Sequence, residues 1–192
     1  MSEIIENPNL QDENSTIGNK TAVVAIIGRP SVGKSTFLNT ASGEKISIVS
    51  PVPQTTRNAV KGIINTNLGQ LVFIDTPSYH NSEKKFNLKL RSLTKEQLDS
   101  CDAILYLIDA SRTPGEEEQL TAELLKPYSE KVVVAINKID LPEANVSKSR
   151  LFVTESFPKM TANHVFDISA QNDIGINELL RGLYDFAPVA EH

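Results

Sequence analysis

Apolar runs of strand length alternate along this chain with segments in which apolar residues recur every three or four positions. The run at residues 22–27 is continuously apolar, as expected for a strand that is covered on both faces of a sheet. Alternation of this kind predicts an α/β fold, built as a mostly parallel six-stranded sheet with helices on both faces. The predicted strands cover residues 22–27, 59–65, 70–74, 102–109, 131–136 and 164–168.

One pair of these strands is predicted to be antiparallel. A short turn at Asn67, Leu68 and Gly69 separates the second run from the third, and this spacing is typical of a hairpin. The sheet is therefore expected to carry one antiparallel edge strand.

Helical spacing follows most of the predicted strands. Thr113, Pro114 and Glu116 fit a helix start in which Thr is the N-cap, Pro the first helical residue and Glu the third. A short helix is expected to end before Pro158. The apolar residues expected on the inward faces of the other helices are Phe37, Leu38 and Ala41; Phe86, Leu90 and Leu93; and Ile176, Leu179, Leu180 and Leu183.

The bulk properties limit what the chain can be. Its 192 residues are read as a polar leader at residues 1–20, predicted to be disordered, and one folded domain at residues 21–188. A net charge of −5 argues against a broad surface that grips a nucleic-acid backbone. No apolar run approaches the roughly 20 residues that span a bilayer, and the N-terminus lacks the order of a signal peptide. The single cysteine, Cys101, precedes an apolar run and is expected to be a core thiol rather than a nucleophile.

The first predicted strand runs directly into the sequence GRPSVGKS, which begins at Gly28. A buried strand, a glycine-rich turn and a helix start are the context that a phosphate-binding loop requires. Its backbone N–H groups can form a nest for phosphate oxygens, and the helix dipole adds to their effect. The alternative is a strand-to-helix turn that binds nothing. The residues expected around the phosphates are Ser31, Val32, Gly33, Lys34, Ser35 and Thr36.

Within this loop and beyond it, single side chains have distinct expected roles. Lys34 can reach the β- and γ-phosphates, and the Ser35 hydroxyl can hold Mg²⁺. Asp75 ends an apolar strand at DTP, where a carboxylate can hold the same ion from the opposite side. The alternative for this residue is a helix-cap or turn aspartate. The site is thus a candidate for a magnesium–triphosphate complex.

A second motif, NKID, follows a later strand and favours one purine over the other. The carboxylate of Asp140 can accept parallel hydrogen bonds from N1–H and the 2-amino group of guanine, neither of which adenine offers. A site built on such bonds rejects the wrong ligand by about 10⁴-fold or more. Lys138 can lay its aliphatic stem over the base. Alone, NKID could be an ordinary strand exit; after a phosphate loop it indicates guanine.

In this order, GRPSVGKS, QTTR, DTP, NKID and ISA resemble the motifs of the Era-like GTPases, a family of P-loop GTPases of the TrmE–Era type. The resemblance covers residues 21–188 and implies a small GTPase-like G domain that hydrolyses GTP to GDP slowly, with Mg²⁺, as a conformational switch. It implies that residues 44–60 and 76–88 are the switch segments. The residues it assigns are Lys34 to the phosphates; Ser35, Asp75 and Thr56 to Mg²⁺, with Thr55 as the fallback for Thr56; Ser78 to the γ-phosphate; Asn137, Lys138 and Asp140 to guanine; and Ser169 and Ala170 to guanine O6.

The chain departs from this family at several positions. The family usually has Asn at Ser31, a position that related GTPases link to a potassium ion, so K⁺ dependence is left open. Ser78 replaces the glycine of DTPG, and Tyr79 stands where other small GTPases carry a water-positioning glutamine. No side chain is therefore an evident base. Arg29 and Arg57 are expected to have solvent-exposed or structural roles.

The resemblance also implies partners and a location. The expected partners are a guanine nucleotide, the small ribosomal subunit and 16S rRNA, with RNA contacted mainly through a C-terminal KH domain that is absent from this chain. The expected location is the cytoplasm, with peripheral association at the inner membrane as an option. Two other functions stay open: a GTP-sensing adaptor that hydrolyses weakly, motivated by Ser31 and Ser78, and the G domain of a tRNA-modification GTPase.

Overall fold

A computed structural model describes residues 20–43, 60–75 and 95–188, and within these ranges all six predicted strands are present. They form one sheet in the order β2-β3-β1-β4-β5-β6. The α/β prediction is therefore confirmed. The strands are β1 (Lys20–Ile27), β2 (Val60–Thr66), β3 (Gly69–Asp75), β4 (Ala103–Asp109), β5 (Val132–Asn137) and β6 (Val165–Asp167).

The sheet is parallel apart from its β2 edge. β1 lies between β3 and β4 and is parallel to both, whereas β2 pairs with β3 in antiparallel register from Thr66 opposite Gly69. Gly69 has a φ of 139° and closes the hairpin where its backbone approaches Lys20; an added Cβ would collide with the Lys20 carbonyl. The predicted antiparallel edge strand is confirmed, and its turn depends on a glycine.

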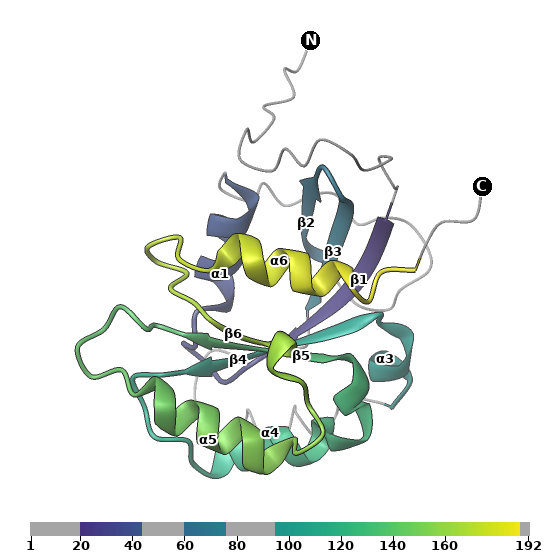
Figure 1. The fold of residues 1–192 in the computed structure, drawn as a ribbon. Helices are drawn as coiled ribbons and strands as arrows, with labels where there is room; N and C mark the ends of the chain where they lie inside the picture. The colour runs from purple at the N-terminus through teal and green to yellow at the C-terminus, as the bar shows by residue number, and fades with distance from the viewer. Residues whose placement is uncertain (1–19, 44–59, 76–94, 189–192) are drawn as a thin grey trace.

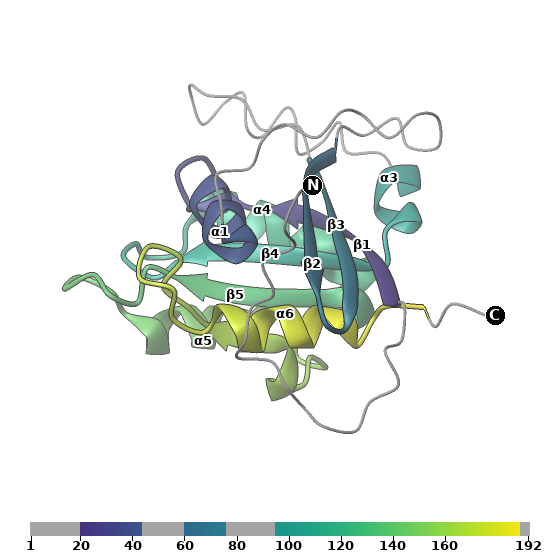
Figure 2. The same cartoon turned by 90° about the horizontal axis from the view of Figure 1, so that it is seen from above.

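Helices cover both faces of the sheet, with α1 and α6 on one side and α4 and α5 on the other (Figure 1). In the view from above, α1 and α6 lie on the near side of β4 and β5 (Figure 2). The helices are α1 (Lys34–Ser42), α3 (Lys95–Ser100), α4 (Glu116–Leu125), α5 (Val146–Ser156) and α6 (Ile176–Tyr184), with 3₁₀ turns at η1 (Lys126–Lys131) and η2 (Ala162–His164). The helical pattern expected at Phe86, Leu90 and Leu93 lies outside the described residues.

Each face of the sheet has its own hydrophobic core, because side chains of a strand point alternately to opposite sides. In β4, Leu105 and Leu107 face α1 and α6, whereas Ile104 and Tyr106 face α3, α4 and α5. All four side chains are at most 1 % exposed. The predicted inward residues of α1 and α6 join the first core, where Phe37 meets Phe73 edge-on at 5.8 Å between ring centroids.

The predicted start of α4 is wrong. The helix begins at Glu116, and its N-cap is Gly115 rather than Thr113. The backbone N–H of Gly115 donates to Glu118 Oε2 at 2.8 Å, so the acidic residue of the capping box is Glu118, not Glu116. The sequence offers two overlapping capping patterns, and the one that satisfies the Gly115 N–H forms.

Two expectations from bulk properties can be compared with the described residues. Cys101 is 4 % exposed and its thiol lies 3.1 Å from the Leu98 carbonyl, so the prediction of a core thiol is confirmed. Burial raises the pKa of this thiol, which keeps it protonated and unreactive at neutral pH. Among the helices of the described ranges, none combines the length and apolar character needed to cross a membrane.

Candidate functional site

Among the described residues, the motifs GRPSVGKS, NKID and ISA lie where the parallel strands end. β1 leads into GRPSVGKS, β5 into NKID and β6 into Ser169 and Ala170, so these loops share one edge of the sheet. Asp75, the last residue of β3, pairs with Ile26 of β1, two residues before the phosphate loop begins. Ligands of open α/β sheets bind at this edge, where carboxyl ends of neighbouring strands diverge.

The phosphate loop is a tight turn that reverses into α1. Ser31 and Gly33 adopt positive φ angles of 65° and 106°, and the backbone N–H of Val32 reaches the Arg29 carbonyl at 3.3 Å. The Lys34 ammonium spans the loop and donates to the Gly28 carbonyl at 2.8 Å. This alternation of left-handed and ordinary backbone is the conformation that turns successive N–H groups toward an anion.

Gly33 is required at its position for two reasons. Its φ of 106° is unfavourable for any residue with a side chain, and an added Cβ would lie 2.4 Å from Asn137 Nδ2. α1 begins directly after it, and the N–H of Phe37 bonds the Gly33 carbonyl at 2.9 Å. Within the described ranges, no side chain caps this helix start, and its first turn has no acidic residue. The positive end of α1 therefore has the character that favours an anion.

Asn137 joins the phosphate loop to the loop after β6. Asn137 is 2 % exposed. Its Nδ2 donates to the Val32 carbonyl at 2.9 Å, and its Oδ1 accepts from the N–H of Ala170 at 3.0 Å. Thr40 adds a third link, because its hydroxyl donates to the Ala170 carbonyl at 2.7 Å. The resemblance assigns Asn137 to guanine, but in this structure both amide atoms hold protein loops together.

Asp140 is exposed and lies beside the loop that follows β6. Its Oδ1 accepts a hydrogen bond from the hydroxyl of Ser169 at 2.7 Å, and the same hydroxyl accepts from the N–H of Asn172 at 3.1 Å. Ser169 itself is fully buried, and its backbone exchanges two hydrogen bonds with Ile174. A rigid small hairpin therefore fixes one oxygen of Asp140, while the side chain stays open to solvent.

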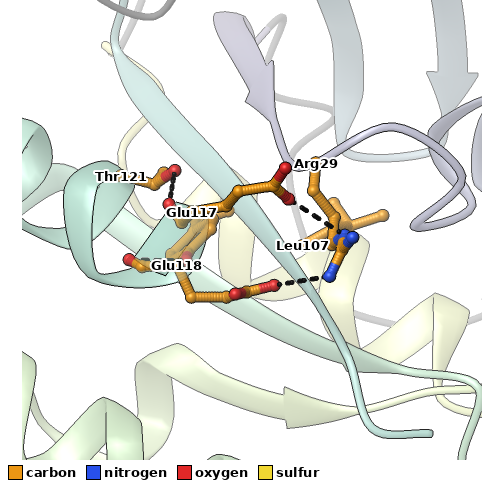
Figure 3. A pocket seen from close by; sticks show the side chains of 6 residues that line it. Arg29, Leu107, Glu117, Glu118 and Thr121 are labelled. Atoms are coloured by element: carbon orange, nitrogen blue, oxygen red, sulfur yellow. Dashed lines mark hydrogen bonds and ion pairs between the residues drawn. The ribbon is translucent and has the colours of Figure 1, made fainter. Parts of the chain in front are cut away.

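Arg29 has a structural role, one of the two that the sequence favoured. Its Nε lies 3.3 Å from Glu117 Oε2 and its Nη1 lies 3.4 Å from Glu118 Oε1, and all three side chains are at most 12 % exposed (Figure 3). Glu118 is also the capping residue of α4. These two ion pairs thus connect the first part of the phosphate loop to the start of α4.

Sequence reasoning missed Asp109, the last residue of β4. Asp109 is 5 % exposed, and its Oδ2 lies 2.8 Å from the ammonium of Lys138. Burial acts to raise the pKa of this carboxyl, but hydrogen bonds from Lys138 and Ser111 outweigh it, so the pKa lies below its ordinary value. The available signal was positional: Asp109 is a carboxylate at the end of the strand between those that carry the two recognised motifs.

The remaining predicted residues are less defined. Ser35 is exposed at the start of α1, and Thr36 follows it, partly exposed. Thr56, its alternative Thr55, Ser78 and most of both predicted switch segments lie outside the described residues.

The sheet order, the glycine-rich loop before α1 and the loop at Asn137–Asp140 together define a G domain of the P-loop GTPase class. The sequence model of a family described as "50S ribosome-binding GTPase" matches residues 23–138. The chain belongs to this family.

Individual relatives narrow the comparison. GTPase Era of Treponema denticola is 54% identical over 171 residues, which are 89% of this chain and 58% of that protein. A variant of Era of Aquifex aeolicus, solved bound to GDP·AlF4⁻, superposes with a TM-score of 0.66 at 34% identity, over 90% of this chain and 58% of that one. Era in complex with MgGDPNP and nucleotides 1506–1542 of 16S ribosomal RNA gives a TM-score of 0.67 at 34% identity, over 90% and 59%. The chain thus spans a little under three fifths of the length of these relatives.

Proposed function

We propose that this domain binds a guanine nucleotide across its two loops and hydrolyses GTP. The observation that carries the proposal is a pair of hydrogen bonds at the Asn137 amide, which donates to the Val32 carbonyl at 2.9 Å and accepts from the Ala170 N–H at 3.0 Å. These bonds connect the loop after β1 with the loop after β6, which supports the use of both loops by one ligand. A single buried amide thus keeps the two loops at a constant separation, as a ligand that contacts both of them requires.

At the phosphate end, the backbone from Ser31 to Thr36 surrounds the β- and γ-phosphates, and Lys34 exchanges its contact with Gly28 for the phosphate oxygens. A Cβ at Gly33 would collide with Asn137, and no side chain of the described residues caps the start of α1. The backbone of this loop and the start of α1 therefore suit a polyphosphate. Ser35, Asp75 and Thr56 supply the hydroxyl and carboxylate oxygens that Mg²⁺ prefers. The ion, when bound, neutralises charge that develops on the β- and γ-oxygens.

At the base end, Asp140 accepts hydrogen bonds from guanine, and Lys138 covers the purine face with its stem. The N–H of Ala170 is engaged by Asn137 in this structure, so contact with guanine O6 uses the neighbouring backbone of the Ser169–Ala170 loop or a rearrangement of that bond. Asn137 acts as a positioning residue that keeps both ends in register.

Hydrolysis is proposed to be slow. An in-line water must be oriented by backbone or by an added partner, because Tyr79 stands where other GTPases place a glutamine and Arg29 is held by two carboxylates. An arginine supplied by a partner can raise such rates by about 10³–10⁵. Residues 44–60 and 76–88, with Ser78 at the γ-phosphate, are the proposed switch segments.

The cellular role is proposed from the relatives. A related Era binds MgGDPNP together with a segment of 16S ribosomal RNA, and the present chain is 34% identical to it. We assign the domain to assembly of the small ribosomal subunit in the cytoplasm, with RNA contact made mainly by a KH domain attached to it and peripheral association at the inner membrane as a further option. Neither a GTP-sensing adaptor nor a tRNA-modification GTPase is favoured by the named relatives.

The decisive experiment is calorimetric titration of GDP and ADP into the wild-type protein and Asp140→Ala. The wild-type protein is expected to prefer GDP by about 10⁴-fold, and the variant to lose most of this preference, because the bonds to N1–H and the 2-amino group are removed. Asp185→Ala, which removes an exposed carboxylate at the end of α6, is the control and keeps the preference. An unchanged preference in Asp140→Ala contradicts the proposal.

A further inference from the structure

The lysine of the guanine loop is held in an unusual position. Lys138 has a φ of 68°, in the left-handed region that a residue with a long side chain enters only when its surroundings hold it there. It directly follows β5, and the next turn begins at once, with Leu141 N–H bonded to the Lys138 carbonyl at 3.1 Å. This backbone conformation sets the direction in which the side chain leaves the loop.

Two groups hold its ammonium. Lys138 Nζ donates to the Ser31 carbonyl at 2.7 Å and to Asp109 Oδ2 at 2.8 Å. Ser31 belongs to the phosphate loop and Asp109 to the end of β4, so the lysine stem crosses between them. A flexible four-carbon chain loses most of its rotamer freedom when its head group is fixed in this way.

Asp109 is itself immobilised. Its Oδ1 accepts from the N–H and the hydroxyl of Ser111, at 2.9 and 2.5 Å, and its backbone pairs with Asn137 in the sheet. The following N–H, of Ala110, donates to the Asn137 carbonyl at 2.9 Å. Asp109 thus presents one oxygen to Ser111 and the other to Lys138 from a rigid strand end.

We infer that Asp109 is a positioning residue for guanine-nucleotide binding, acting through Lys138 by fixing its stem where the purine face must lie. The inference rests on the proposed function, because it concerns the same site. It predicts that loss of the Asp109 carboxylate weakens the binding of every purine nucleotide by the same factor, whichever groups the purine edge offers to Asp140. The alternative is that Asp109 only shapes the turn at Ser111.

The test is a double-mutant cycle on nucleotide affinity with Asp109→Asn, Lys138→Met and the double variant. Asparagine keeps the shape and can still accept from Ser111, and methionine keeps most of the stem without the ammonium. Asp109→Asn is expected to weaken GDP binding by about tenfold, the scale of one lost charged hydrogen bond. In the Lys138→Met background the same change is expected to have little effect, because its target is gone.

Two further measurements separate the outcomes. Inosine diphosphate, which lacks the 2-amino group, is expected to lose the same factor as GDP in Asp109→Asn. Asp167→Asn, which changes an exposed pair with Arg150 at the end of β6, is the control and keeps wild-type affinity. An undiminished effect in the Lys138→Met background, or none in the wild-type background, overturns the inference. A wild-type protein that binds neither nucleotide overturns the proposed function, and this inference with it.

Discussion

At the scale of single residues, the site is built from backbone conformations that few residue types tolerate. Gly33 fits because nothing larger can stand beside Asn137 Nδ2, whereas Ser31 adopts a φ of 65° with a side chain present. Asparagine tolerates this left-handed region better than serine does. The asparagine usual in the family at this position would thus be accommodated by the backbone as it stands.

Ser31 also leads to an expectation about monovalent ions. We expect single-turnover GTP cleavage by the wild-type protein to proceed at the same rate, within about twofold, in potassium and sodium chloride, because Ser31 lacks the amide oxygen that could coordinate potassium at that point. Ser31→Asn is expected to gain a potassium-stimulated rate of at least about tenfold without loss of folding, since its backbone fits. Strong potassium stimulation of the wild-type protein would contradict this expectation.

At the scale of elements, a few buried polar contacts hold loops from different strands together, in addition to apolar packing. Asn137 links the loops after β1 and β6, and Arg29 links the loop after β1 to α4. Tyr184 at the end of α6 accepts a hydrogen bond at 2.8 Å from Thr66, next to the β2–β3 turn. Each contact joins elements that are far apart in the sequence.

The link between Arg29 and α4 is expected to matter for stability. Arg29→Ala leaves two carboxylates facing each other with little solvent, and removal of one partner from a buried ion pair costs about 3 kcal/mol or more. Urea unfolding at pH 7 measures this loss, which Arg29→Lys is expected to restore in part.

Arg150→Ala is the matched control for that measurement. Its ion pair with Asp167 is 2.9 Å long but about a third or more exposed on each side, so its loss is expected to cost about 0–1 kcal/mol. Equal losses for Arg29→Ala and Arg150→Ala would show that the pair with Glu117 and Glu118 contributes no more than a surface contact.

At the scale of the whole molecule, acid sensitivity follows from the lowered pKa of Asp109. Because its folded pKa lies below its unfolded value, Asp109 contributes stability that is fully present above about pH 4 and is lost as the pH falls toward the folded value. We expect the urea midpoints of the wild-type protein and Asp109→Asn to differ most at pH 7, and this difference to shrink as the pH falls below the unfolded pKa of about 4. A difference that does not shrink with falling pH would assign the stability to something other than the ionised carboxylate.

The sequence predicted the sheet well because its strands are continuous apolar runs, such as residues 132–136, that are buried on both sides. It identified the loops at residues 28–36 and 137–140 because the residues of each motif are close neighbours in the chain, and their contacts with phosphate and guanine stay a prediction. It misplaced the start of α4, where Glu116 and Glu118 compete as capping residues and only the folded turn decides. It also missed the anchor at Asp109, which contacts Lys138 from 29 positions away, a pairing that only the parallel register of β4 and β5 creates.

The shared amide of Asn137 has a consequence for the way a bound nucleotide departs. Since one planar amide bonds both the Val32 carbonyl and the Ala170 N–H, the loops after β1 and β6 share one anchor. We expect a nucleotide bound as proposed to leave both loops together, and stopped-flow displacement to show a single exponential decay.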